Sequence, residues 1–213
     1  MAVLKVDMGG ILAALKRHYP HPRMELVYHN PLQLLVATVL SAQCTDKRVN
    51  IVTKTLFRKY RMVEDYANAN LKEFEKDVRS TGFYRAKARN IKNAAGKMIE
   101  EYGGRVPKTM EELLTLPGVA RKTANIVLTE GYGIVEGIAV DTHVKRVSYR
   151  MGFTDNINPD KIERDLMEKI PKRDWGRVNM TLVLHGRYVC TAKKPLCSEC
   201  IINTMCPKRG AAV

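Results

Sequence analysis

A proline–glycine pair between two helical patterns places the strongest constraint on how this chain can fold. Thr109 and Glu112 have capping-box spacing, which predicts a short helix beginning directly after the threonine. Pro117 and Gly118 should end that helix, because proline cannot continue a helix and glycine accepts unusual backbone angles. A second helix is expected from about Val119, with one apolar stripe made of Ala120, Ala124, Val127 and Leu128. The pattern predicts a helical hairpin, and free N–H groups at the start of its second helix could hold a phosphate.

The remainder of the chain is also helical in pattern. Apolar residues recur at three- and four-residue spacing, and no regular strand–helix alternation interrupts them. Capping signals mark several helix starts, among them Asn30 followed by Pro31, and Asn70 followed by Glu73. Asp46 is expected to cap the helix that begins after it. We therefore expect an all-α fold.

The charge balance indicates an anionic partner. The chain has 213 residues, with 36 Lys and Arg against 22 Asp and Glu, which gives a net charge of +14. This excess suits DNA, RNA or an anionic membrane surface, although a basic protein without such a partner would also fit. No stretch approaches the roughly 20 apolar residues of a membrane span, and the N-terminus lacks a signal-peptide pattern. We therefore expect no membrane partner and a cytoplasmic location.

Cysteines crowd the C-terminal part of the chain. Of the five, four follow the spacing C-x6-C-x2-C-x5-C, namely Cys190, Cys197, Cys200 and Cys206. In an intracellular chain this clustering favours a metal site over disulfides. Four thiolates can bind either zinc or an iron–sulfur cluster, so the spacing alone leaves both open. Cys44 stands apart at the end of an apolar helical pattern and is expected to be a buried small residue without chemistry.

These patterns together resemble the endonuclease III family, which are helix-hairpin-helix DNA glycosylases with an associated lyase activity. The segments that carry the resemblance are Leu116–Asn125, Val140–His143, Ser41–Asp46 and the four C-terminal cysteines. The resemblance covers nearly the whole chain. The family hairpin usually reads Gly-Val-Gly, whereas this one reads Gly118-Val119-Ala120.

The resemblance implies two helical lobes that flank a DNA groove. One would be a six-helix bundle domain at residues 24–135, which contains the hairpin. The other would be a discontinuous helical domain formed by residues 1–23 and 136–213. Its loop at 190–206 would hold a [4Fe-4S] cluster on the four cysteines, with a role in structure and DNA binding.

Lys122 and Asp141 carry the chemistry that the resemblance implies. Lys122 lies opposite the apolar stripe, where an ordinary lysine is a solvated surface residue. As the family nucleophile, its amine would displace a damaged base and form a Schiff base with the sugar, after which β-elimination cuts the strand. Asp141 would accept a proton and balance the charge of the cationic sugar. Asp141 also fits the N-cap of a helix beginning near Thr142, and both roles can hold together.

Other residues are candidates for contact with DNA. An enzyme that acts on a base in a duplex must extrude the base and fill the space it leaves. Gln43 can both donate to and accept from the orphaned partner base. Phe83, in an expected turn between helices, can act as an aromatic wedge, or it can pack beneath that turn. The remaining candidates lie on the hairpin and the cysteine loop: Gly118, Ala120, Arg121, Lys193 and Lys194.

The resemblance implies a bifunctional base-excision repair enzyme. It would remove oxidised pyrimidines of the thymine glycol type from duplex DNA and cut abasic sites as a β-lyase. Its partner would be double-stranded DNA with a damaged base or an abasic site. The protein would bind this DNA as a monomer, and it would be associated with the nucleoid through the DNA. The alternatives are a mismatch-specific thymine glycosylase and a non-catalytic helix-hairpin-helix DNA-binding module. The second would have no use for Lys122 paired with Asp141.

Overall fold

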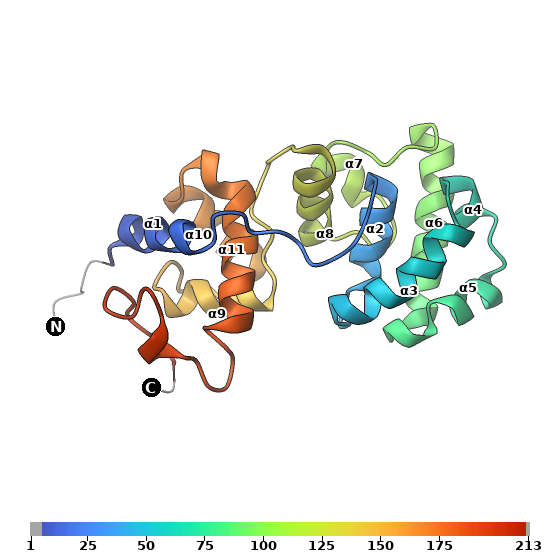
Figure 1. The fold of residues 1–213 in the computed structure, drawn as a ribbon. Helices are drawn as coiled ribbons and strands as arrows, with labels where there is room; N and C mark the ends of the chain where they lie inside the picture. Colours follow the sequence, from blue (N-terminus) through green and yellow to red (C-terminus); the bar gives the residue numbers. More distant parts are fainter. Residues whose placement is uncertain (1–5, 212–213) are drawn as a thin grey trace. The chain divides into compact units, whose positions relative to one another are not determined.

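The computed structural model describes residues 6–211, and every regular element in that range is a helix (Figure 1). The all-α expectation is therefore confirmed. Contacts divide the chain into two compact units. One runs from Met24 to Glu136, and the other joins the residues up to Arg23 with those from Gly137 onward. Within the described range, none of the helices combines the length and the apolar character needed to cross a membrane.

The unit Met24–Glu136 is built around one long helix, α6. Its elements are α2 (Pro31–Leu40), α3 (Asp46–Lys59), α4 (Val63–Ala67), α5 (Leu71–Asp77), η1 (Arg79–Thr81), α6 (Tyr84–Tyr102), α7 (Met110–Leu114), α8 (Arg121–Ile126) and η2 (Val127–Tyr132). Helices α2, α4 and α5 and the short η1 all pack against α6. Helix α2 buries every residue from Leu34 to Leu40, as its apolar sequence predicts.

Side-chain caps set several helix starts in this unit. Asn30 and Asn70 cap α2 and α5 as predicted, each accepting a hydrogen bond from the backbone N–H three residues later. The expectation for Asp46 is wrong. Thr45 is the N-cap of α3, its hydroxyl accepts from the N–H of Arg48 at 3.3 Å, and Asp46 is the first helical residue. A carboxylate in that first turn still interacts favourably with the helix dipole.

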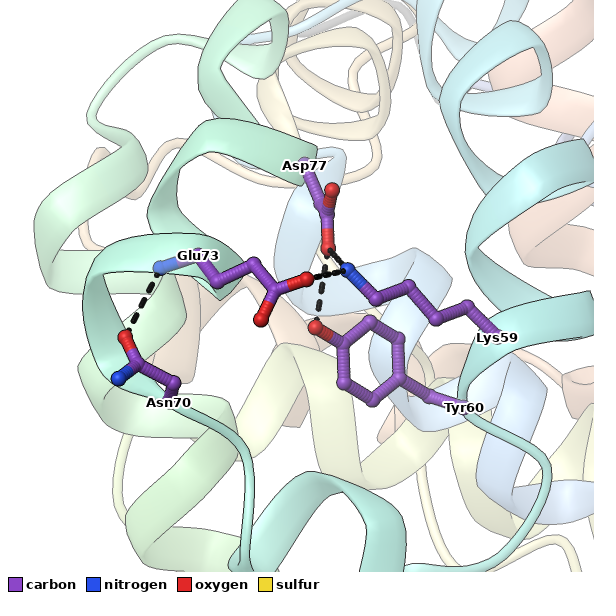
Figure 2. Close-up of polar contacts among 5 residues, drawn as sticks. All are labelled: Lys59, Tyr60, Asn70, Glu73 and Asp77. Carbon is purple, nitrogen blue, oxygen red and sulfur yellow. Dashed lines mark hydrogen bonds and ion pairs between the residues drawn. The ribbon is translucent and has the colours of Figure 1, made fainter.

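A charged network ties the end of α3 to α5 (Figure 2). The ammonium of Lys59 lies 2.6 Å from the carboxylate of Glu73 and 2.7 Å from that of Asp77. The hydroxyl of Tyr60 donates to the same Asp77 carboxylate at 2.9 Å. The ring of Tyr60 also contacts the rings of Tyr66 and Phe74, which contact each other. Aromatic burial and ion pairing therefore hold the same junction.

The second unit contains helices from both ends of the chain. They are α1 (Met8–His18), α9 (Thr142–Arg150), α10 (Pro159–Lys169), η3 (Lys172–Asp174), α11 (Trp175–Tyr188) and η4 (Cys197–Glu199). Helices α9 and α11 pack together, and an ion pair at 2.7 Å joins Lys16 of α1 to Asp174. The N-terminal helix α1 thus belongs to the same unit as the C-terminal helices.

The expectation that Cys44 is buried is wrong. Helix α2 ends at Leu40, four residues earlier, so Cys44 lies in the following turn and is only half-buried. The reason is that the chain leaves the helix before the apolar pattern ends.

Candidate functional site

The first half of the hairpin forms as predicted. Thr109 is the N-cap of α7, and its hydroxyl accepts a hydrogen bond from the backbone N–H of Glu112 at 3.3 Å. The hydroxyl also donates to the Glu112 carboxylate at 2.9 Å. Helix α7 ends at Leu114, before the proline.

The turn of the hairpin requires glycine for two reasons. Gly118 has a φ of +80°, a conformation that side chains disfavour. A Cβ added there would also lie 2.8 Å from the Cβ of Asn90 in α6. Helix α8 begins at Arg121 rather than near Val119, because Ala120 is an extended N-cap residue with φ −97° and ψ 169°. Reversal of the chain takes more residues than the pattern indicated.

The apolar stripe of the second helix is confirmed except at its first position. Ala120 is exposed, since it lies outside the helix, whereas Ala124, Val127 and Leu128 are buried. Val127 and Leu128 belong to η2, a π-helical turn that continues α8. Nothing in the local sequence indicated this widening, which occurs where the segment packs against α2.

Lys122 is the second residue of α8 and is exposed. The buried residues that follow it, Ala124 to Ile126, hold the helix against the core. The amine is therefore accessible to a large substrate such as DNA. That accessibility is the property a nucleophile in this position needs.

Gln43 and Phe83 share an unusual backbone conformation. Among the described residues other than glycine, positive φ occurs at Gln43 (53°), Phe83 (47°) and Lys208 (55°). Such conformations cost roughly 1 kcal/mol or more, and they cluster at functional sites. Phe83 is 66% exposed, so the interpretation of an aromatic ring packed beneath the turn is wrong. Both side chains are presented to solvent from strained turns in the same unit.

Asp141 lies in the other unit and caps α9, as predicted. Its Oδ1 accepts a hydrogen bond from the backbone N–H of Val144 at 2.8 Å. The residue is half-buried. One carboxylate oxygen is therefore fixed by the helix start, which orients the group as a whole.

All four C-terminal cysteines line one cavity. Burial raises the pKa of the Cys200 and Cys206 thiols, and the neighbouring cysteines add to the effect. His185 also lines the cavity, and its Nε2 lies 3.6 Å from Cys200 Sγ. Burial lowers the pKa of His185 to about 4, so its imidazole is neutral at physiological pH. Thiols are suitable ligands for a metal centre. Among the residues that the structure describes, however, no three His, Cys, Asp or Glu side chains are placed to hold a single metal ion.

Two arginines of α9 support the cysteine loop, and sequence reasoning missed both. Arg150 is 7% exposed, and its guanidinium donates to Thr191 O at 2.7 Å and to Cys190 Sγ at 3.5 Å. Arg146 donates to Cys190 O at 3.1 Å. A basic residue on a helix is usually solvated, so no local signal marks these two. Lys193 is exposed on the loop that they shape, and so is Lys194.

The predicted residues divide between the two units. The unit Met24–Glu136 contains Gln43, Phe83, Gly118, Ala120, Arg121 and Lys122. The other contains Asp141, the four cysteines, Lys193 and Lys194.

Family models match most of the chain. The model for HhH-GPD superfamily base excision DNA repair proteins matches residues 36–172. The model for the iron–sulfur binding domain of endonuclease III matches residues 190–206. An endonuclease III of Synechocystis sp. is 52% identical over 212 residues, covering 100% of this chain and 97% of that protein. This chain belongs to the endonuclease III family.

Further comparisons agree with this endonuclease III membership. An endonuclease III of Bacillus subtilis is 49% identical over 191 residues, covering 88% of this chain and 86% of the relative. A solved structure of a trapped endonuclease III–DNA covalent intermediate superposes with a TM-score of 0.91, 46% identity and 95% coverage of both chains. The matched iron–sulfur domain begins at Cys190 and ends at Cys206. The metal centre of this family member is therefore a [4Fe-4S] cluster rather than zinc.

Proposed function

We propose that this DNA glycosylase and abasic-site lyase removes oxidised pyrimidines of the thymine glycol type, with Lys122 as its nucleophile. The observation that supports the proposal is that Lys122 is exposed on α8, the second helix of the hairpin. A relative with 46% identity has been trapped as a covalent intermediate with DNA, and such an intermediate needs a nucleophilic side chain. Lys122 supplies one at an accessible helix start.

The chemistry begins with attack of the Lys122 amine on the sugar carbon that bears the damaged base. The new carbon–nitrogen bond forms as the glycosidic bond breaks, and the base leaves with the electron pair and takes up a proton. The sugar ring then opens to a Schiff base on Lys122. Removal of the neighbouring sugar proton expels the 3′ phosphate, which cuts the strand on the 3′ side. Water finally hydrolyses the imine and regenerates the amine.

Asp141 is proposed as the proton acceptor in these steps and as the countercharge for the cationic sugar. Its Oδ1 is held by the backbone N–H of Val144, which fixes the orientation of the carboxylate. A carboxylate oriented in this way needs no rearrangement when charge develops on the sugar.

Gln43 and Phe83 are proposed to handle the DNA around the extruded base. Phe83 would act as a wedge in the stack, and Gln43 would pair with the orphaned base. Their strained backbones support this proposal, because strain persists where the surrounding structure holds a functional conformation.

The [4Fe-4S] cluster is proposed to be bound by Cys190, Cys197, Cys200 and Cys206. When bound, it supplies thiolate–iron bonds that cross-link the loop, and it takes no part in base excision. The loop would then present Lys193 and Lys194 to the DNA backbone, while Gly118, Ala120 and Arg121 would contact a phosphate at the hairpin. The net charge of +14 supports backbone contacts of this kind.

We further propose that the protein acts as a monomer in the cytoplasm, associated with the nucleoid through DNA. One extruded base requires only one enzyme molecule. The basic charge supports association with bulk DNA between lesions.

The decisive experiment is borohydride trapping on a duplex with a single thymine glycol. Borohydride reduces the Schiff base to a permanent cross-link, which we expect for the wild-type chain and not for Lys122→Ala. Lys72→Ala is the matched control, since Lys72 is likewise an exposed lysine at the second position of a helix, α5. DNA binding by the Lys122 variant should persist in a gel-shift measurement.

Other outcomes identify the alternatives. Trapping on a thymine mismatch but not on thymine glycol would favour the mismatch glycosylase. Binding without trapping on any lesion or abasic site would leave a non-catalytic DNA-binding module. Equal trapping by Lys122→Ala and the wild type would contradict the assignment of the nucleophile.

A further inference from the structure

A buried lysine in α6 lies between the two turns that present Gln43 and Phe83. Lys87 is only 5% exposed, and its Nζ donates to the carbonyl oxygens of Leu40 and Thr81, both at 2.7 Å. Lys87 is well separated in sequence from Leu40. The ammonium therefore joins two chain segments that local interactions alone would leave independent.

The carbonyl of Leu40, at the end of α2, accepts its hydrogen bond from Lys87 rather than from the backbone N–H four residues later. The last carbonyls of a helix have no partner within it. The N–H four residues further along, that of Cys44, donates instead to Ser41 O at 3.0 Å. Lys87 supplies a donor to Leu40 O from another helix, and the turn that follows contains Gln43 with its φ of 53°.

The carbonyl of Thr81 leads directly into the second turn. Gly82 follows with a φ of 69°, and Phe83 with a φ of 47°. The backbone N–H of Lys87 also donates to the carbonyl of Phe83 at 3.1 Å, which forms the first bond of α6. Lys87 thus contacts both neighbours of Gly82. Its side chain donates to Thr81, and its backbone N–H donates to Phe83.

Burial of a cation costs free energy, which the two hydrogen bonds to carbonyl oxygens offset. Burial disfavours the charged form and lowers the pKa of the Lys87 ammonium. An apolar side chain of similar length would fill the same space but could hold neither carbonyl. Charge-assisted hydrogen bonds are stronger and more directional than contacts between apolar groups.

We propose that Lys87 is a positioning residue that locks the Gln43 turn to the Phe83 turn, so that wedge and base-pairing group enter the DNA together. The inference rests on the proposed roles of Gln43 and Phe83. Lys87 itself is too buried to touch DNA. Its effect must therefore pass through the two turns.

The same helix offers a matched control. Lys92 is a half-buried lysine of α6 whose Nζ also donates to two carbonyls, those of Ala67 at 2.5 Å and Ala69 at 2.9 Å. Those carbonyls lie at the end of α4 and in the loop after it, in neither of the turns under test. Loss of the Lys92 ammonium should lower the stability of the protein as loss of the Lys87 ammonium does. It should leave the position of Phe83 unchanged.

The test compares Lys87→Met with Lys92→Met in the full-length, cluster-containing protein. We expect both variants to unfold at lower denaturant concentration. Single-turnover removal of thymine glycol from a duplex should fall on the order of ten- to a hundredfold in Lys87→Met, because small misplacements of a positioned group slow reactions this much. Lys92→Met should change this rate by less than about threefold.

Two further measurements separate positioning from general damage. Cleavage of an abasic site in single-stranded DNA needs no wedge, so Lys87→Met should retain it. In a background carrying Gln43→Ala and Phe83→Ala, Lys87→Met should have little further effect on excision, because residues that act through one another are not additive. If Lys87→Met fails to fold, Lys87→Gln compared with Lys92→Gln replaces the pair.

Equal slowing by the two variants would overturn the inference, as would a Lys87 effect that persists undiminished in the double-alanine background. A wild-type chain that leaves thymine glycol in place would instead overturn the proposed function, and this inference with it.

Discussion

The side chain of Asn90 lies so close to Gly118 that a Cβ added to the glycine would stand 2.8 Å from both the Cβ and the Nδ2 of Asn90. Asn90 belongs to α6, the helix that also carries Lys87. The hairpin turn and the turns that contain Gln43 and Phe83 are therefore all built against one helix. This arrangement lets substitutions in the turns be tested within a single folding unit.

Gly118→Ala should destabilise the protein by about 2 to 4 kcal/mol, because it combines a left-handed backbone with a clash in a packed region. Urea unfolding measures the loss. We also expect weaker binding to undamaged duplex, since the turn must shift. Ala120→Gly is the control, because Ala120 is exposed with an extended backbone, and it should change stability by less than about 1 kcal/mol. Equal losses from the two substitutions would contradict the account of the turn.

Phe83 should show a trade-off between stability and activity. Phe83→Gly relieves a φ of 47° and loses little burial, so it should be more stable than Phe83→Ala by about 1 kcal/mol. Both variants should remove thymine glycol more slowly than the wild type, because both lack the ring that is proposed to act as a wedge. Thermal unfolding and single-turnover excision test the two statements. Full activity in Phe83→Gly would show that the ring has no role in the reaction.

Asp141 has a capping role and a proposed chemical role, and two substitutions separate them. Asn is as good an N-cap as Asp, so Asp141→Asn should stay within about 0.5 kcal/mol of the wild-type stability, while Asp141→Ala should lose about 1 kcal/mol. Both should lose base excision, since neither retains the carboxylate. An active Asp141→Asn variant would reduce the residue to a helix cap.

The network at Tyr60 predicts a loss of stability in alkali. Burial, together with the hydrogen bond to Asp77, raises the pKa of Tyr60 to about 12 from its ordinary value of 10. The folded state therefore binds the phenolic proton more tightly than the unfolded state. Its contribution to stability is complete below pH 10 and is lost as the pH rises through about 12.

Tyr60→Phe should remove this part of the alkaline loss. Its free energy of unfolding should lie about 1 kcal/mol below the wild type at neutral pH, from the missing hydrogen bond, and then fall less steeply above pH 10. Urea unfolding at several alkaline pH values measures the slope. Tyr66 also has a raised pKa, so a smaller slope remains. Identical slopes in both proteins would exclude a contribution from Tyr60.

The cluster loop should depend on each of its four thiols. Cys200→Ser should lower the iron content and the brown colour, open the 190–206 loop to proteases and weaken binding to duplex DNA. Cys44→Ser is the control, since Cys44 lies outside that cavity, and it should keep full iron content. A colourless wild-type protein with stoichiometric zinc would contradict the assignment of the metal centre.

Local chemistry made much of this protein predictable. Asn30, Thr109 and Asp141 cap helices because a side-chain oxygen satisfies an N–H only three residues away. The cysteine spacing indicated a metal centre because four thiolates so close in sequence can meet on one site. Apolar periodicity predicted the all-α fold because each pattern involves residues close together in sequence, within a single helix.

Features that depend on contact between distant segments were decided only by the tertiary structure. The sequence marks Phe83 as a turn residue, but its exposure and left-handed backbone depend on how η1 and α6 pack. Spacing alone does not distinguish Lys87 and Arg150 from ordinary surface cations, yet both are buried and donate to carbonyls far along the chain. Short-range hydrogen bonds can be inferred from spacing alone. The burial of a charge depends on partners that are brought together only when the whole unit folds.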